Sequence, residues 1–336
     1  MDNGYFQRLL SVIRELDAEQ IALLEQAIME RREGSGPGQP TVTAVATPPR
    51  VPDGTIATIE ARLEADRRCP HCQSTKVQKW GHANDLRRYM CRSCKVTFNA
   101  LTGTPLAQLH KRELWDAHAQ ALNDGISLRR VSARVGIGLE TAFRWRHRFL
   151  KSPKTLKPEK LSGLVEADET YFLQSSKGSR ELKRAPRKRG GKATKPGLSD
   201  EQVPVLIARD RDSKATTDAI LPNRSAASIL AVLKPIIQPR SVLVSDAATT
   251  YQVAAGELKI PHVYLNVSAG ERALGDYHVQ NVNSYTSHLK VWMVRFCGVA
   301  TKYLDSYLGW HRMNDRHSSN QTANSTLRAA LGCSPT

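Results

Sequence analysis

Four cysteines in two closely spaced pairs constrain this chain more than any other feature. Cys69 and Cys72 form one Cys-x-x-Cys unit (CPHC), and Cys91 and Cys94 form a second (CRSC). Each unit places two thiolates on one tight turn, and two such turns close a tetrahedral shell around Zn(II) with no open position. The spacing therefore predicts a structural zinc ribbon over residues 58–104, with short strands between the turns. The alternative is a dithiol redox pair.

The charge balance indicates the kind of partner. The net charge of +17 over 336 residues favours a polyanion, of which nucleic acid is the commonest and an anionic membrane surface is the rival. No apolar run approaches the roughly 20 residues that span a bilayer, so we expect no membrane-embedded segment. The N-terminal residues do not have the pattern of a signal peptide. Cysteines paired as metal ligands favour a reducing, cytoplasmic location.

The pattern of apolar residues predicts a multidomain α/β chain. Residues 1–33 have helical spacing and predict a small N-terminal module, and the Gly-, Pro- and Thr-rich residues 34–57 predict a flexible linker. Helical patterns return over residues 105–152. Residues 160–318 alternate short β-branched runs with helices, which predicts an α/β domain, and residues 319–336 are expected to be a C-terminal tail. The expected strands of that domain are 164–167, 203–209, 241–245 and 263–267.

Residues 127–150 (SLRRVSARVGIGLETAFRWRHRFL) predict a helix-turn-helix. Ser127 can cap the first helix, Gly136 can form the turn, and a second helix then runs from about residue 139 to 150. The polar side of this second helix is basic, as expected for a helix that docks in the major groove. Its candidate DNA contacts are Arg144, Arg146, His147 and Arg148. Residues two apart diverge on a helix, so some of these must contact phosphate or another domain. The alternative is a solvated basic face on a plain helical hairpin.

Polar side chains follow two of the expected strands of the α/β domain. Asp168 and Asp246 each stand at a strand end, where open α/β sheets place their sites. Asn283 and Lys290 lie two turns apart on one face of an expected helix. Two carboxylates can bridge a pair of Mg(II) ions that activate a water or a 3′-hydroxyl for phosphoryl displacement. An Asn oxygen can complete one metal shell, and a lysine can hold a phosphate.

The sequence also allows structural roles for the acidic residues. An aspartate at a strand end often caps the next helix instead. Glu166 and Glu169 also compete with Asp168 as the functional acid, since Glu166 shares its strand face. The absence of GxxxxGK[ST] and HExxH motifs disfavours an ATP-driven motor and a zinc protease.

A basic insert, residues 177–199, separates the first two expected strands. It holds nine Lys or Arg and one acid, and its glycines and prolines predict an extended segment that can follow DNA phosphates. A solvated loop is the alternative. The candidate contacts in this insert are Lys183, Arg184, Arg187, Lys188 and Arg189.

The motifs resemble, in order and spacing, the ISXO-like group of bacterial insertion-sequence transposases. The similarity runs from about residue 60 to about residue 315 and rests on CPHC, CRSC, TAFRWRHRFL, VEADETYF, KRGG, LVSDAATTY and HVQNVNSYTSHLKVWM. The resemblance implies a ribonuclease-H-like mixed-sheet catalytic core that uses Mg(II) or Mn(II). It also implies an acidic triad in which Asp168 and Asp246 are the first two members. Asn283 stands where much of the wider family has Glu, and Lys290 matches a family lysine.

The resemblance implies a DNA transposase that binds the terminal inverted repeats of its element, hydrolyses the strand ends and joins the 3′-hydroxyls to target DNA. The expected partner is double-stranded DNA, with a homo-oligomer, at least a dimer, when two ends are held together. The expected location is the bacterial cytoplasm, in association with the nucleoid. The alternatives are a non-catalytic DNA-binding regulator derived from such an enzyme and a structure-specific nuclease that cuts without joining.

Overall fold

The computed structural model describes residues 53–182, 185, 191, 193–194, 199–266, 269–316 and 321–333. The chain divides into two compact units, residues 1–49 and 50–336, and every described residue belongs to the second. The predicted helical module 1–33 and most of the predicted linker lie outside the described residues. Among the described helices, none is long and apolar enough to cross a bilayer.

The cysteine-containing segment forms a three-stranded antiparallel sheet. Its strands β1 (Val77–Ala83), β2 (Leu86–Cys91) and β3 (Thr97–Asn99) follow one another in space as they do in sequence. Asn84 and Asp85, between β1 and β2, both have positive φ. That conformation matches the twist of paired strands in a two-residue hairpin, and Asn and Asp tolerate it better than most residues. The strands that the sequence predicted around the cysteines are therefore confirmed.

A helix, α3 (Asp53–Ala65), precedes the ribbon and packs against it. Ile59 and Leu63, one turn apart, are buried, and the Glu60 carboxylate accepts a hydrogen bond from the N–H of Arg87 at 2.7 Å. This helix begins inside the segment that the sequence predicted as linker, 34–57, so that boundary is corrected. Its short apolar stripe stabilises a helix only against a partner surface, which local composition does not reveal.

The next region is helical, as predicted. It contains α4 (Trp115–Asn123), α5 (Leu128–Val135) and α6 (Leu139–Phe149), preceded by one 3-10 turn, η1 (Arg112–Leu114). Gly136 ends α5 with a φ of 71°, a left-handed conformation that disfavours any residue with a Cβ. The helix-turn-helix outline over residues 127–150 is therefore present, with the turn at the predicted glycine.

The last helix, α11 (Ala323–Ala330), packs on α4 and α3. Thr322 and Ser325 form a reciprocal capping box at its start, with N–H to Oγ distances of 3.0 and 3.1 Å. Leu327 is buried. The segment predicted as a C-terminal tail, 319–336, thus includes a packed helix. Its apolar residues are too few to predict burial without knowledge of the surface that receives them.

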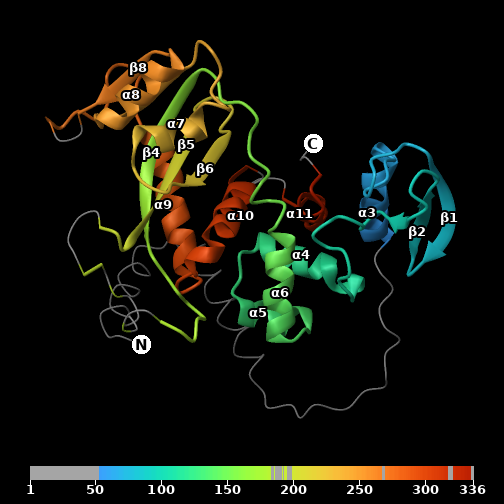
Figure 1. Ribbon diagram of the computed structural model, residues 1–336. Helices are drawn as coiled ribbons and strands as arrows, with labels where there is room; N and C mark the ends of the chain where they lie inside the picture. Colours follow the sequence, from blue (N-terminus) through green and yellow to red (C-terminus); the bar gives the residue numbers. More distant parts are fainter. Residues whose placement is uncertain are drawn as a thin grey trace, which may run out of the picture. The chain divides into compact units, whose positions relative to one another are not determined.

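The α/β region is built on one mixed, five-stranded sheet (Figure 1). Its order is β6 (Thr216–Ile220), β5 (Gln202–Asp210), β4 (Leu164–Leu173), β7 (Val242–Asp246) and β8 (His262–Leu265). β4, β5 and β6 pair antiparallel, while β4, β7 and β8 pair parallel. The predicted α/β class and four predicted strands are confirmed. β6 was missed because its sequence, TTDAI, has no apolar run.

Helices cover both faces of this sheet. α7 (Ala226–Leu233) and α8 (Thr249–Leu258) share one hydrophobic core with the first face, which includes Val165, Ala167, Leu206, Leu243 and Tyr251. α9 (Gln280–Val294) and α10 (Leu304–Arg316) share a second core with the opposite face, which includes Ile207, Val244, Leu265, Val282 and Leu289. Alternate residues of each strand therefore enter different cores, as the two-residue period of a strand requires.

The second core continues from the sheet into the helical region and the ribbon. Trp310 on α10 is fully buried, and its indole N–H donates to the carbonyl of Leu122 on α4 at 2.9 Å. On the sheet side, Arg312 forms a buried ion pair with Asp218 of β6. These contacts place α10 between the sheet and α4.

Candidate functional site

The register of two parallel strands brings Asp168 and Asp246 to the same level of the sheet. β4 and β7 pair with Glu166 opposite Val244, and each aspartate lies two residues farther along its strand. Because side chains alternate between faces, both carboxyl groups project from the same face of strands that lie about 4.8 Å apart. β7 ends at Asp246, so the carboxylate pair stands at the C-terminal end of this strand.

The Asp168 carboxyl group responds strongly to its surroundings. Burial and the nearby charge of Asp246 raise the pKa of Asp168 to about 6, whereas the Glu169 N–H and the Lys290 ammonium act in the opposite direction. The Glu169 N–H donates to Asp168 Oδ1 at 2.8 Å, and the Ala248 N–H donates to Asp246 Oδ1 at 3.2 Å. Two neighbouring carboxylates that repel each other form a donor set that a divalent cation neutralises. The residues therefore fit a hard cation such as Mg(II) or Mn(II).

α9 carries the other two residues of the predicted constellation. Asn283 and Lys290 are exposed and lie on the same side of this helix. The effect of the Lys290 charge on Asp168 places the ammonium near the carboxylate pair. Asn283 directly follows Val282, whose N–H donates to the carboxylate of Glu166 on β4 at 3.0 Å. The first turns of α9 are thereby joined to the strand that bears Asp168.

The structure separates the two glutamates that compete with Asp168 in the sequence. Glu166 is fully buried, and Arg211 Nε donates to its carboxylate at 2.9 Å. Its oxygens are thus engaged within the fold. Glu169 projects from the opposite face of β4, because it is one residue out of phase with Asp168.

Glu169 is a third carboxyl group near the aspartate pair. Burial, followed by the charges of Asp168 and Asp246, raises the pKa of Glu169 to about 7, while Tyr251 and Arg224 lower it. The sequence presented this residue only as a competitor of Asp168. The signal that could have singled it out is the succession of two acids after a buried apolar run, with a tyrosine five residues after Asp246.

The raised pKa of Asp168 predicts that the stability of the metal-free protein depends on pH. A carboxyl group whose pKa is about 6 when folded and about 3.9 when unfolded contributes its full stability below about pH 4. That contribution is lost as the pH rises through about 6. Replacement of Asp168 by Asn mimics the protonated form at every pH. We therefore expect Asp168→Asn to raise the Tm by about 2–4 °C at pH 8 and to leave it unchanged at pH 4.

Thermal unfolding in buffer that retains zinc but lacks Mg(II) and Mn(II) measures this difference. Addition of Mg(II) at pH 8 should then raise the Tm of the wild type and not that of the variant. An equal Tm difference between the two proteins at both pH values would contradict the assigned electrostatics.

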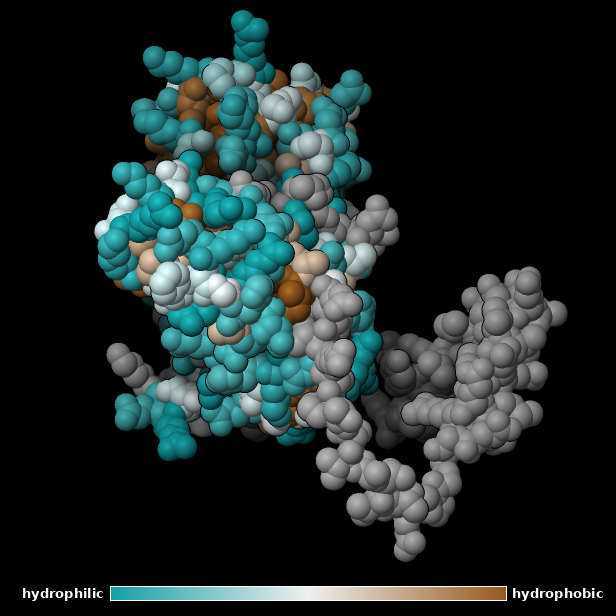
Figure 2. Space-filling view, turned by 90° about the vertical axis from the view of Figure 1, so that its right-hand side faces the viewer, coloured by the Kyte–Doolittle hydropathy of each residue, from teal (hydrophilic) through white to brown (hydrophobic). Residues whose placement is uncertain are grey.

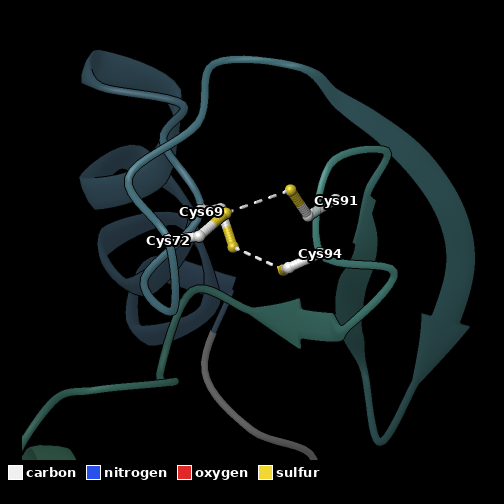
Figure 3. Close-up of side chains that lie close together, drawn as sticks. All are labelled: Cys69, Cys72, Cys91 and Cys94. Atoms are coloured by element: carbon white, nitrogen blue, oxygen red, sulfur yellow. Dashed lines mark hydrogen bonds between the residues drawn. The ribbon is translucent and has the colours of Figure 1, made fainter.

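The four predicted zinc ligands meet in one cluster (Figure 3). Their sulfur atoms all lie within 4.8 Å of one another, and the Sγ atoms of Cys69 and Cys94, like those of Cys72 and Cys91, are 3.6 Å apart. A tetrahedral Zn(II) site with bonds of about 2.3 Å requires sulfur separations of about 3.8 Å. The geometry of the cluster therefore fits zinc.

The backbone of the two cysteine turns is alike. Gln73 and Lys95, each following the second cysteine of a pair, have φ values of 59° and 61°. The N–H of each donates to the carbonyl of the first cysteine at 2.9 Å. The N–H groups of Cys94 and Ser93 lower the pKa of Cys91 to about 6. Burial and the neighbouring thiols raise the pKa of Cys72 to about 12, because without a cation the cluster cannot hold several thiolates together. Turns that direct amides at sulfur stabilise thiolates, the form in which cysteine binds zinc.

The predicted DNA contacts on α6 are only partly exposed. Arg146 is buried, with 1% of its surface exposed, and Nη2 donates to the carbonyl of Ile126 at 2.7 Å. Its guanidinium lies 5.0 Å from the ring centroid of Trp310, and burial lowers its pKa. In this conformation Arg146 joins α6 to α10 and does not face DNA, which corrects the prediction for this residue.

The remaining three residues of α6 differ in exposure. The His147 ring stacks on Tyr303 with centroids 4.0 Å apart, and burial with the charge of Arg146 lowers its pKa to about 4. Arg148 donates to backbone carbonyls of residues 105 and 107. The side chain of Arg144, by contrast, is 70% exposed and lies 3.7 Å from Glu140. Of the four candidates, Arg144 alone presents its charge mainly to solvent.

The candidate contacts of the basic insert, Lys183, Arg184, Arg187, Lys188 and Arg189, lie outside the described residues. Lys177, at the start of the insert, is described. Its ammonium donates to three successive carbonyls after α9, those of residues 296, 297 and 298, at 2.8–3.1 Å. This lysine therefore joins the start of the insert to the segment that follows α9.

Comparisons with known proteins bear on the whole site. Residues 160–310 match the model of the ISXO2-like transposase domain. An uncharacterized protein in transposable element ISH50 of Halobacterium salinarum is 28% identical over 248 residues, which cover 71% of this chain and 82% of that protein.

Solved structures give weaker likenesses. The catalytic core domain of HTLV-2 integrase in complex with magnesium aligns with a TM-score of 0.28 and 11% identity, over 49% of this chain and 91% of that chain. A chain of the simian T-cell lymphotropic virus intasome aligns with a TM-score of 0.28 and 12% identity, over 61% of this chain and 74% of that chain. On the match to its model, the α/β region of this chain, residues 160–310, belongs to the family of ISXO2-like transposase domains.

Proposed function

We propose that this protein is the DNA transposase of an insertion sequence, which cleaves strands at the terminal inverted repeats of its element and joins them to target DNA. The observation that carries the proposal is the alignment of Asp168 and Asp246 on neighbouring parallel strands within the ISXO2-like transposase domain. A pair of close carboxylates at a sheet end, next to a lysine, is suited to metal-dependent phosphoryl transfer.

A ribonuclease-H-like core is part of this proposal. In that fold three antiparallel strands adjoin two parallel ones. The sheet order β6-β5-β4-β7-β8, with its change from antiparallel to parallel pairing at β4, has this arrangement. β4 is central and carries Asp168, β7 is its parallel neighbour and carries Asp246, and α9 packs against β4 and β5. The topology supports assigning the third ligand to α9.

The proposed roles follow from the chemistry of each group. Asp168, Asp246 and the Asn283 oxygen would hold Mg(II) or Mn(II), which activates the attacking hydroxyl and stabilises the leaving oxygen. The ammonium of Lys290 would hold a phosphate of the bound strand, close to Asp168, whose pKa it lowers. Asn283 brings no charge, so this set should bind cations more weakly than a triad with three carboxylates.

DNA binding would use the exposed basic residues on both sides of the helix-turn-helix. Arg144 on α6 is joined by Arg129 and Arg130 on α5, which are also exposed. Together with the basic insert, these side chains supply the phosphate contacts that a chain of charge +17 is suited to make. Figure 2 shows that hydrophilic residues cover most of the described surface on one face. Arg146 is not included, because its guanidinium is buried.

Strand cleavage and joining on a defined substrate test the function. The substrate is a duplex that ends in the terminal repeat found beside the coding region, and the target is a supercoiled plasmid. We expect a nick at the repeat end and joining of its 3′-hydroxyl to the plasmid, both dependent on Mg(II) or Mn(II). Two copies of the chain, each holding one end, would make the reaction steeply dependent on protein concentration.

Other outcomes of the same assay identify the alternatives. Specific binding of the repeat without a nick, at any concentration of Mg(II) or Mn(II), would indicate a non-catalytic regulator. Nicking without joining, and without preference for the repeat, would indicate a structure-specific nuclease. Duplexes with scrambled repeats serve as the matched control, because they keep the charge and length of the substrate.

A further inference from the structure

The buried carboxylate of Glu166 binds the start of the helix that carries Asn283. One carboxylate oxygen accepts from Asn281 Nδ2 at 2.8 Å, and the other accepts from the Val282 N–H at 3.0 Å. Both donors lie in the first turn of α9. The N-terminus of a helix carries unpaired N–H groups and a partial positive charge, so a carboxylate at this point stabilises it.

Arg211 extends this contact to the segment before α9. Its Nε donates to the Glu166 carboxylate at 2.9 Å, and its Nη2 donates to the carbonyl of His278 at 3.0 Å. The third guanidinium nitrogen, Nη1, donates to the carbonyl of Asp276. Glu166 and Arg211 therefore fix both the first turn of α9 and the chain that leads into it.

The position of Glu166 on β4 connects these contacts to the proposed metal site. Glu166 lies two residues before Asp168 on the same strand face, and its partner Val282 immediately precedes Asn283. The contacts of Glu166 thus connect the segment of β4 that carries Asp168, the first proposed metal ligand, to the turn of α9 that carries Asn283, the third. Asn283 itself is exposed, so few packing contacts fix its side chain. Its position therefore depends on how firmly the first turn of α9 is held.

We propose that Glu166 is a positioning residue, which holds the N-terminal turn of α9 so that the Asn283 oxygen meets the carboxylate pair of Asp168 and Asp246. This inference rests on the proposed function, because it takes Asn283 as a metal ligand. A neutral ligand contributes less attraction than a carboxylate, so its contribution depends more on placement. Residues that orient metal ligands in this way typically change metal affinity or activity by about 10–100-fold when replaced.

Glu166→Gln is the test variant, because glutamine keeps the shape and one acceptor oxygen but cannot form the ion pair with Arg211. We expect the variant to need a higher Mn(II) concentration for half-saturation, by about 10-fold or more, with DNA binding unchanged. Asn283→Ala should weaken Mn(II) binding similarly. Because both changes would remove the same ligand from the metal, the double variant should be scarcely weaker than either single one.

Asp210→Asn is the matched control for a general loss of structure. Asp210 is a buried carboxylate of the neighbouring strand β5, and it accepts hydrogen bonds from N–H groups of Ser162, Asp212 and Ser213. Asp210→Asn should lower the Tm as Glu166→Gln does. Any effect that it has on Mn(II) affinity, however, should multiply with the effect of Asn283→Ala in the double variant.

Two readouts separate this inference from the proposed function. Mn(II) affinity is measured by electron paramagnetic resonance, and strand cleavage is measured on the repeat substrate. If Asp168→Ala weakens Mn(II) binding while Glu166→Gln does not, or if the effects of Glu166→Gln and Asn283→Ala multiply, the positioning role is overturned and the function stands. If the non-additive loss of Mn(II) binding is found in a protein that cleaves no repeat DNA, the positioning role holds and the proposed function fails.

Discussion

Asp168→Ala and Asp246→Ala are each expected to abolish Mg(II)-dependent cleavage of terminal-repeat DNA, with a loss of rate of about 1,000-fold or more. The two carboxylates stand side by side through the register of β4 and β7. Removal of either destroys the pair, and Glu169 cannot replace it because its side chain projects from the opposite face of β4. Neither residue lies in the ribbon or the helix-turn-helix. Repeat binding, measured by gel shift at a fixed salt concentration, should therefore stay within about twofold of the wild type.

The control for this experiment is Asp116→Ala, which removes an exposed carboxylate of α4. It changes the net charge as much as the two test variants do, and we expect it to cleave at the wild-type rate. Full cleavage by either test variant would exclude the aspartate pair as the metal site. Loss of both binding and cleavage would mean that the variant had lost its fold, which circular dichroism detects.

Loss of one zinc ligand is expected to remove the metal and unfold the ribbon. Cys91 is fully buried in the cluster of four sulfurs, and the closed shell leaves no other protein ligand to replace it. We expect Cys91→Ser to reduce bound zinc from about one ion per chain to well below half. Because metal binding supplies folding free energy to small metal domains, the ribbon should then unfold, and proteases should cut within residues 66–100.

Bound zinc is measured by mass spectrometry of the metal, and the cut sites by mass spectrometry of the peptides. Cys297→Ser is the matched control, since it removes an exposed thiol outside the cluster and should leave the zinc content unchanged. A Cys91→Ser protein that kept its zinc and its protease resistance would show that the cluster does not hold the metal as proposed.

The sequence predicted the chemical groups of the candidate sites better than it predicted how the helices and strands pack. The spacing of the cysteines predicted a cluster that the structure contains, because each pair is a local turn. Asp246 stands at the strand end that the apolar run predicted. Asp168 was also expected at a strand end but lies inside β4, which continues to Leu173. The register that aligns the two aspartates is visible only in the sheet. The identity of Asn283 as a ligand stays a prediction.

Contacts between distant segments could not be predicted. The sequence shows that α6 is basic, but not that the ring of Trp310 covers the guanidinium of Arg146, because nothing local marks which side of a helix another helix will cover. Glu166 was indistinguishable from a catalytic acid for the same reason. Its partners Arg211 and Asn281 lie far along the chain, and burial with a cation, rather than residue type, decides what a carboxylate does.

The pairing of β4 with β7 also determines when during synthesis the proposed cation site can form. The two strands are parallel neighbours separated by two antiparallel strands and a helix in sequence, and such non-local pairing forms late in folding. A nascent chain that ends before Asp246 lacks one of the two paired aspartates, and α9 follows later still. The proposed phosphoryl-transfer site is therefore assembled only after both β7 and α9 have been synthesised.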